Sequence, residues 1–234
     1  MPRKLWAALL VLGLALALAR TVTSAGLGAF VDEATVADNT FATGTWTTLY
    51  ASGDTYLTGG QPNQNQGTDT FLRVQQSGSN RSLVIFDSTE ITNAAGGRTL
   101  RSATLQLYIE TNGDNWGGSG RTVDAHRITT SWTELGATWN CPDDTNTSNG
   151  SADCPTQWNG GSFDATATDS FLITNGLTGW VEWDVTADVA AFLASTAANY
   201  GWIIKKTSEG AAGQVDFTSR EGAANDPELY LVFQ

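Results

Sequence analysis

Short segments with apolar residues at every second position limit this chain more than any other feature of its sequence. In residues 102–110, Ala103, Leu105, Leu107 and Ile109 fall on one side of an extended chain. Similar or continuously apolar segments, most of them bounded by Gly, Asn, Asp and Ser, recur at 70–74, 81–87, 121–129, 180–186, 200–206, 214–220 and 228–234. The sequence therefore predicts an all-β domain, an antiparallel β-sandwich of the jelly-roll type.

One segment has helical rather than strand spacing. Asp184 is a plausible N-cap. The apolar residues that recur at helical spacing after it are Val185, Val189, Phe192 and Leu193. We therefore expect one short helix that crosses an end of the sandwich.

Two segments, 112–120 and 140–161, are rich in Gly, Asn, Asp and Ser and are expected to form long, mobile loops. The second segment contains both cysteines of the chain, Cys141 and Cys154, and we predict a disulfide between them. Such a bridge would stabilise the fold by roughly 3 kcal/mol. Zinc is a poor alternative, because there is no CxxC motif and the sole histidine, His126, is distant in sequence.

The N-terminus has the pattern of an export signal. Arg3 and Lys4 precede an apolar run from Leu5 to Ala19, and small residues follow. The run of about 15 residues is shorter than the roughly 20 that a membrane span needs, so a cleaved signal is favoured over a membrane anchor. An ordinary signal-peptidase pattern places the cleavage after Ala19.

The charge of the chain excludes some partners. Three basic residues and no acidic ones lie in residues 1–28, which leaves nine basic against 24 acidic residues, a net charge of −15. This field repels nucleic acids and anionic membranes. We therefore predict neither as a partner.

Seven segments, in order from about Asp54 to Gln234, resemble the DNRLRE-type domain of secreted surface proteins, a family that includes carbohydrate-binding modules. They are 54–74, 80–87, 100–110, 128–140, 180–193, 199–206 and 215–233. The resemblance implies a jelly-roll sandwich that binds an extracellular polysaccharide. It also implies that three elements lie near one another: Asn63, Asn65 and Gly67; Arg81, Leu83, Phe86 and Asp87; and Ser219, Arg220 and Glu221. The name-giving element departs from its usual form and reads AANDPEL at 223–229.

The asparagines of the first element have two interpretations. In the structural one, Asn63 and Asn65 bond the backbone of their own turn, and Gly67 takes a positive φ. In the functional one, these amides and nearby Arg73 or Arg81 face a groove and bind the hydroxyls or uronate carboxylates of a glycan.

The arginines have a structural alternative too, since Arg81 or Arg220 can be the buried partner of Asp87 or Glu221. For an acidic glycan, the groove must be locally basic against the unfavourable overall charge. Six arginines could provide this: those at 73, 81, 101, 121, 127 and 220.

Trp116 and Trp158 are candidates for rings that stack on a sugar, because each lies among glycines and asparagines in a long loop. Tyr56, beside the asparagine loop, is a weaker candidate. The other tryptophans considered are expected in the core: Trp132, Trp139, Trp183 and Trp202.

No catalytic motif stands out. His126 lies in a strand pattern. The candidate carboxylates occur in no motif that signals chemistry; they are Asp54, Asp87, Glu134, Glu182, Asp184 and Glu221. We therefore predict a non-catalytic protein. Loops rich in Asp and Asn suit a structural Ca²⁺, although its ligands are not evident from the sequence.

A second resemblance covers about 20 residues. The segment behind the signal is similar to the N-terminus of TasA and camelysin-type matrix proteins in Ala29, Phe30, Asp32, Thr40, Phe41, Ala42, Gly44 and Thr45. It implies cleavage after Gly28, and hence a signal peptide (1–28), a strand-prone segment (29–50) and the sandwich domain (51–234). The strand-prone segment either pairs within its own sheet or adds to a neighbouring subunit.

Together these features predict a secreted, non-catalytic polysaccharide-binding module of the cell surface or matrix. The alternative is a structural subunit of an extracellular fibre, assembled by donation of the N-terminal strand.

Overall fold

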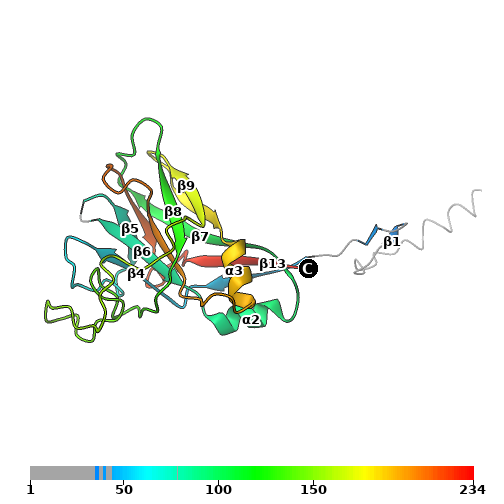
Figure 1. The fold of residues 1–234 in the computed structure, drawn as a ribbon. Coiled ribbons are helices and arrows are strands. Elements are labelled where there is room, and N and C mark those ends of the chain that lie inside the picture. The colour runs from blue at the N-terminus through cyan, green and yellow to red at the C-terminus, as the bar shows by residue number, and fades with distance from the viewer. Residues whose placement is uncertain (1–34, 37–38, 41–43, 78) are drawn as a thin grey trace, which may run out of the picture. The chain divides into compact units, whose positions relative to one another are not determined.

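A computed structural model describes residues 35–36, 39–40, 44–77 and 79–234 (Figure 1). β1 (Thr35–Val36) and β2 (Asn39–Thr40) form a two-stranded antiparallel sheet of their own. The predicted signal peptide and both possible cleavage sites lie outside the described residues, as does most of the segment similar to TasA. From residue 44 the elements are β3 (Thr45–Tyr50), β4 (Gly53–Thr58), β5 (Phe71–Gln75), β6 (Asn80–Ile85), α2 (Ser88–Ala95), β7 (Leu100–Asn112), β8 (Arg121–Arg127), β9 (Asp169–Ile173), β10 (Gly179–Asp184), α3 (Thr186–Leu193), β11 (Trp202–Lys206), β12 (Gln214–Thr218) and β13 (Glu228–Phe233).

Strands β3 to β13 form one antiparallel sheet that folds over into two layers. One layer has the order β4-β6-β11-β8-β9. The other layer has the order β3-β13-β7-β10. The C-terminal end of β7 also pairs with β12, and β12 pairs with β5, so these two strands extend this layer. The β5–β6 hairpin connects the layers. This confirms the predicted all-β sandwich.

The main core lies between the two layers. All four residues predicted to face inward on β7 are buried there, together with apolar residues of the opposite layer such as Val84, Val123 and Ile204. Trp183 is fully buried, and its ring meets Phe171 and Phe217 edge-on at centroid distances of 6.1 and 6.2 Å. The apolar residues of the alternating pattern therefore lie on the side of the strand that faces this core.

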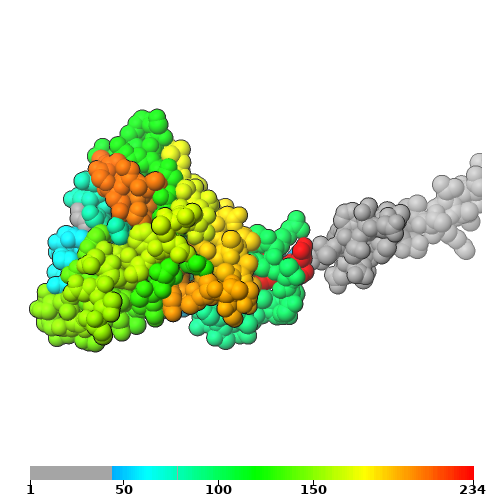
Figure 2. Space-filling view, in the orientation of Figure 1, coloured from blue at the N-terminus to red at the C-terminus, as the bar shows by residue number. Residues whose placement is uncertain are grey.

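A second core covers the outer side of the β4-β6-β11 layer. The chain between β8 and β9 forms a long excursion (residues 128–168) whose Trp132 and Trp158 pack on Leu57, Leu83 and Ile203. Figure 2 shows this yellow-green segment across one side of the domain. Both sides of these strands are therefore buried, and every residue of β4 and β11 is buried even though both strands contain polar residues.

The predicted disulfide is confirmed and lies within this excursion. Cys141 and Cys154 are joined, with 5.8 Å between their Cα atoms. Hydrogen bonds tie the same region to the domain; for example, the Asn140 N–H donates to the Pro62 carbonyl at 3.0 Å. The excursion is therefore a packed layer rather than the free loop that its composition suggests.

The described residues contain two helices, although the sequence analysis predicted one. α2 was missed because its start, Asp87, was assigned to a strand motif. The Asp87 carboxylate accepts the N–H groups of Thr89 and Glu90, and these bonds lower its pKa. Gly96 ends the helix with a φ of 54°. A cap and a C-terminal glycine were therefore present in the sequence.

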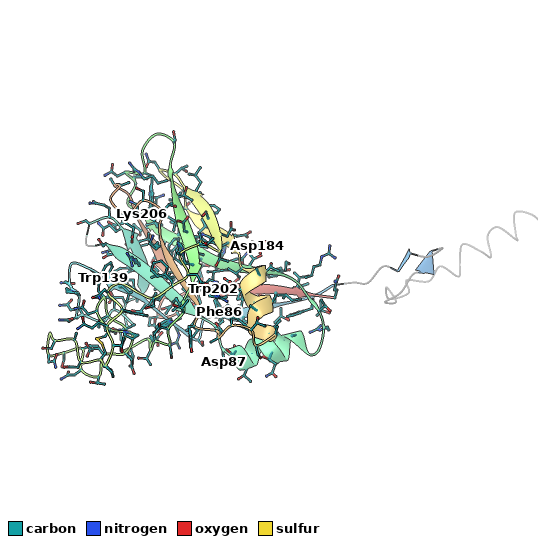
Figure 3. All side chains as sticks on the ribbon, in the orientation of Figure 1. Phe86, Asp87, Trp139, Asp184, Trp202 and Lys206 are labelled. Carbon is teal, nitrogen blue, oxygen red and sulfur yellow. A yellow bond between two sulfur atoms is a disulfide. The ribbon has the colours of Figure 1, made fainter. Side chains whose placement is uncertain are left out.

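The predicted helix after Asp184 is confirmed as α3. Its N-cap is Val185 rather than Asp184, but the Asp184 carboxylate accepts the N–H of Thr186 at 2.9 Å. Phe86 and Trp202 pack near α3, with ring centroids 6.2 Å apart (Figure 3).

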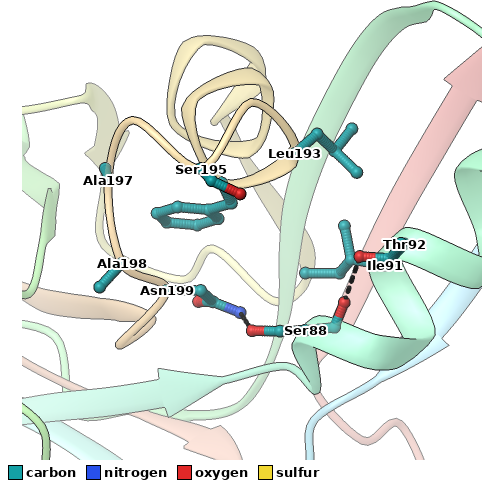
Figure 4. A pocket seen from close by; sticks show the side chains of 9 residues that line it. Ser88, Ile91, Thr92, Leu193, Ser195, Ala197, Ala198 and Asn199 are labelled. Atoms are coloured by element: carbon teal, nitrogen blue, oxygen red, sulfur yellow. Dashed lines mark hydrogen bonds between the residues drawn. The ribbon is translucent and has the colours of Figure 1, made fainter.

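A hollow between α2 and α3 is lined by small or uncharged side chains (Figure 4). Asn199 closes one side of it, because its amide donates to the Ser88 hydroxyl at 3.1 Å and to the Phe86 carbonyl at 2.8 Å. These bonds tie the segment after α3 to the start of α2.

Candidate functional site

The outer side of the β3-β13-β7-β10 layer carries five aromatic side chains, which we call the aromatic face: Trp46, Tyr50, Tyr108, Trp180 and Tyr230. Inward residues of these strands enter the main core, so the intervening residues must point outward. Trp46, Tyr50 and Trp180 are 64%, 57% and 39% exposed. Large apolar rings gathered on one surface at this exposure mark a binding site more often than a structural feature.

The strand register gathers these rings into two pairs. Trp180 lies opposite Tyr108 across β10 and β7, and their rings are 5.4 Å apart in an edge-to-face arrangement. Trp46 stacks on Tyr230 at 5.9 Å. Tyr230 lies opposite Thr104, four residues along β7 from Tyr108, so the pairs are separated by about 13 Å along the strands. The face is therefore extended and flat rather than a closed pocket.

Polar groups lie between the two aromatic pairs. The Gln106 amide donates to the Glu182 carboxylate at 2.7 Å. Glu228 lies opposite both Gln106 and Tyr50, and its pKa is raised by burial and by Asp226. Rings that can stack on the C–H face of a sugar thus alternate with groups that can bond its hydroxyls.

The charge of this face is predominantly negative. Its outward positions, all within the described residues, carry one arginine, Arg101, which is exposed at the bulge near the start of β7, and four carboxylates: Glu110, Glu182, Asp184 and Glu228. The face therefore repels an anionic ligand.

The predicted exposure of Trp116 and Trp158 is wrong. Trp116 is 0% exposed, belongs to the main core, and donates from Nε1 to the Asn112 side chain at 2.8 Å. Trp158 is also buried and donates to the Thr138 carbonyl. Gly213, distant from Trp116 in sequence, allows backbone to pass close over that ring: a Cβ at Gly213, whose φ is 115°, would lie 2.8 Å from it. The Trp116 ring is therefore closely packed in the core rather than exposed.

Loop 112–120 is correspondingly fixed rather than free. The Asn112 amide donates to the carbonyls of Thr174 and Leu177, both at 2.9 Å, and the Asp114 carboxylate accepts the N–H of Gly176. The segment before Trp116 is thereby tied to residues 174–177, as is the Trp116 N–H, which donates to the Asn175 side chain at 2.9 Å.

The remaining aromatic predictions mostly agree with the structure. Trp132, Trp183 and Trp202 are buried as expected, whereas Trp139 is half-buried against the second core. Tyr56, the weaker ligand candidate, is buried and donates to the Asp69 carboxylate at 3.0 Å.

Asn63 and Asn65 hold their loop to the excursion. The Asn63 amide donates to the Gly150 carbonyl at 2.6 Å, and the Asn65 amide donates to the carbonyls of Glu134 and Ala137 at 2.7 and 2.8 Å. One of the asparagine side-chain bonds stays within the turn, because the Asn65 side chain accepts the Gly67 N–H at 3.0 Å. Gly67 does not take the predicted positive φ; a Cβ there would approach the Glu134 carbonyl at 2.3 Å.

Five of the six arginines expected to form a basic groove are engaged within the protein; the sixth, Arg101, is exposed near the start of β7. Arg73 forms a bidentate pair with Asp216 at 2.7 and 2.8 Å, and Arg81 forms one with Glu209 at 2.6 and 2.9 Å. Arg81 therefore does not pair with Asp87, its predicted structural partner. Further contacts are Arg121 with the carbonyls of Asn115 and Ala212, Arg127 with Asp164, and Arg220 with Glu134.

One comparison with known proteins bears on this geometry. A family model described as Carbohydrate-binding module family 96 matches residues 45–168 and 155–233. The chain belongs to carbohydrate-binding module family 96. The match covers every strand from β3 to β13 and confirms the carbohydrate-binding part of the first resemblance. The finer DNRLRE type and the similarity to TasA stay predictions. No curated protein matches the chain.

The aromatic face of this family 96 module was missed by sequence reasoning. A signal was present, because Tyr108 and Trp180 occupy the alternate, outward positions of two clearly periodic segments. The predicted stacking rings were instead Trp116 and Trp158, which lie in loops where exposure was expected. Within the described residues, no helix is long and apolar enough to cross a membrane.

Proposed function

We propose that the protein is an exported, non-catalytic module that binds a neutral polysaccharide on the aromatic face. The single observation that carries this proposal is the presence of five aromatic side chains on one flat sheet surface of a carbohydrate-binding module. Flat aromatic surfaces suit an extended polymer, whereas a closed pocket suits a small ligand.

The preference for a neutral polymer rests on charge. A polyuronate would meet four carboxylates on this surface and a strongly acidic chain overall. The bidentate partners of Arg73 and Arg81 leave these two residues poorly placed to compensate. Hydroxyl groups, in contrast, can donate to Glu182 and Glu228.

The absence of catalysis rests on the positions of the carboxylates. Asp87 and Asp184 accept helix N–H groups, and Glu182 lies on an open surface beside Gln106. A glycosidase needs two carboxyl groups on opposite sides of the scissile bond. The N-terminal signal pattern and the disulfide support export to an oxidising compartment.

Replacement of Trp180 or Trp46 by alanine is expected to weaken polysaccharide binding by about tenfold each, because each removes one stacking ring worth about 1.4 kcal/mol. The measurement is retardation in native gels that contain xylan, β-glucan, alginate, pectin or no polymer. We expect retardation of the wild-type protein by a neutral polymer only.

Leu172→Ala is the matched control, since Leu172 is a 52% exposed apolar residue on β9, outside the aromatic face. It should leave retardation unchanged, and all three variants should unfold near the wild-type temperature. Equal retardation of both tryptophan variants and the wild type would exclude the aromatic face. Retardation by alginate or pectin alone would contradict the preference for neutral polymers.

No observation favours the fibre alternative. β3, the described strand at the end of the strand-prone segment, pairs with β13 of its own chain through all six residues. Assembly in a polymer-free gel would nevertheless be visible as protein held in the well.

A further inference from the structure

Three carboxylates from distant parts of the sequence meet at one point outside the aromatic face. Asp54 comes from β4, Glu134 from the excursion, and Glu221 from the segment after β12. One carboxylate oxygen of each lies within 4.8 Å of the other two. Like charges at this separation repel strongly unless something positive lies among them.

Two oxygens in this cluster are buried without a hydrogen-bond donor. Asp54 is 1% exposed; its Oδ2 accepts the Arg220 N–H at 2.9 Å, but its Oδ1 has no partner. Oε2 of Glu221 is likewise buried and without a partner. A buried carboxylate oxygen without a donor is costly, and such groups are uncommon in native proteins.

Arg220, which contacts the cluster, does not neutralise it. Nη1 of Arg220 contacts both oxygens of Glu134 at 3.0 and 2.8 Å and lies 3.8 Å from Glu221. Three carboxylates and one guanidinium leave a formal charge of −2, which one divalent cation would balance. In agreement, burial first, and then the charges of Glu221 and Glu134, raise the pKa of Asp54 to about 8.

We propose that Asp54, Glu134 and Glu221 bind one Ca²⁺ ion. The donors are all carboxylate oxygens, which suits a hard cation, and the cluster contains no His or Cys for zinc. Ca²⁺ takes six to eight oxygen ligands at 2.3–2.6 Å, so two ligands of one ion lie up to about 5 Å apart. The three side chains meet this limit, and water or backbone oxygens would complete the shell.

The position of the site gives the ion a structural role. It joins the sandwich, through β4, to the excursion and to the segment that leads into β13. Packing against Glu134 is tight, because a Cβ at Gly67 would clash with the Glu134 carbonyl. A catalytic role is a poor alternative, because Oδ1 of Asp54 is inaccessible to a sugar.

The test uses the full purified protein, stripped with EDTA and then dialysed free of chelator. Calorimetric titration with CaCl₂ is expected to show one bound ion per chain. Unfolding temperatures are measured without metal and with CaCl₂ or MgCl₂. At about 100 times the dissociation constant, Ca²⁺ should raise the unfolding temperature by on the order of 5–10 °C.

Glu221→Gln removes one ligand charge while conserving shape and is expected to weaken Ca²⁺ binding at least tenfold. The matched control is Glu90→Gln, an exposed carboxylate on α2, which should change neither Ca²⁺ binding nor the Ca²⁺ shift. Asp54→Asn is expected to abolish the Ca²⁺ shift while the protein still folds.

Absence of both heat and a temperature shift for the wild type would overturn the proposal, as would Ca²⁺ binding retained by both Asp54→Asn and Glu221→Gln. A shift with MgCl₂ alone would overturn the choice of cation. If the carboxylates only share a proton, Asp54→Asn should stabilise the metal-free protein and wild type should ignore EDTA. That result would also contradict the site. None of these outcomes depends on polysaccharide binding, which the native gels measure separately.

Discussion

Replacement of Trp116 by alanine is expected to lower the free energy of unfolding by about 3–5 kcal/mol while polysaccharide binding by the folded protein is unchanged. The ring is fully buried in the main core, and its Nε1–H bond to Asn112 would be lost with it. Gly213, backed against the ring, cannot fill the cavity because it has no side chain. Urea denaturation followed by tryptophan fluorescence measures the change.

Trp46→Ala is the matched control for this prediction, because it removes the same side chain from a 64% exposed position. It should change stability by less than about 1 kcal/mol and weaken binding instead. The two tryptophans should thus separate stability from binding. If folded Trp116→Ala lost polysaccharide binding while its stability was unchanged, this prediction would be wrong and the glycan site would lie in loop 112–120.

Arg81→Ala is expected to lower the free energy of unfolding by about 3 kcal/mol. The side chain is 14% exposed, forms a bidentate pair with Glu209, donates to the Gly160 carbonyl, and lies 4.7 Å from the centroid of the Trp139 ring. Truncation would leave a partly buried carboxylate and a carbonyl without donors. Chemical denaturation measures the loss, and retardation by a neutral polymer should persist.

Arg73→Ala provides the comparison. Its bidentate pair with Asp216 has similar distances. Arg73 is more exposed than Arg81, at 27% against 14%, but the carboxylate left without its partner is more buried, at 10% for Asp216 against 28% for Glu209. We therefore expect a loss of similar size, about 3 kcal/mol. Joint replacement of Arg81 and Glu209 by methionine should recover part of the loss seen in Arg81→Ala. A loss below about 1 kcal/mol for Arg73→Ala would contradict the importance assigned to burial of the carboxylate.

The strands could be predicted because they depend on local periodicity. In 102–110, every inward residue follows from alternation alone, and the structure confirms each one. α2 was overlooked even though Asp87 and Gly96 mark its ends, because the apolar residues before it suggested a strand that continued.

The candidate site was harder to predict than the fold. Glycine and asparagine around Trp116 are typical of both an exposed loop and a backbone that passes close over a buried ring. Only the contact between Gly213 and Trp116 distinguishes these cases. For the arginines, the partners Asp216 and Glu209 lie more than 120 positions away along the chain, so no local pattern could identify them.

The sequence by itself determined the class of fold, the disulfide, the helix after Asp184 and the family. These properties depend on neighbouring residues, on the two cysteines of the chain, or on a pattern along its whole length. Tertiary structure alone decided the register that aligns Trp180 with Tyr108 and stacks Trp46 on Tyr230, and the meeting of Asp54, Glu134 and Glu221. The physical reason is that a binding surface or a cation site depends on distances between strands, which the packing of the whole domain sets.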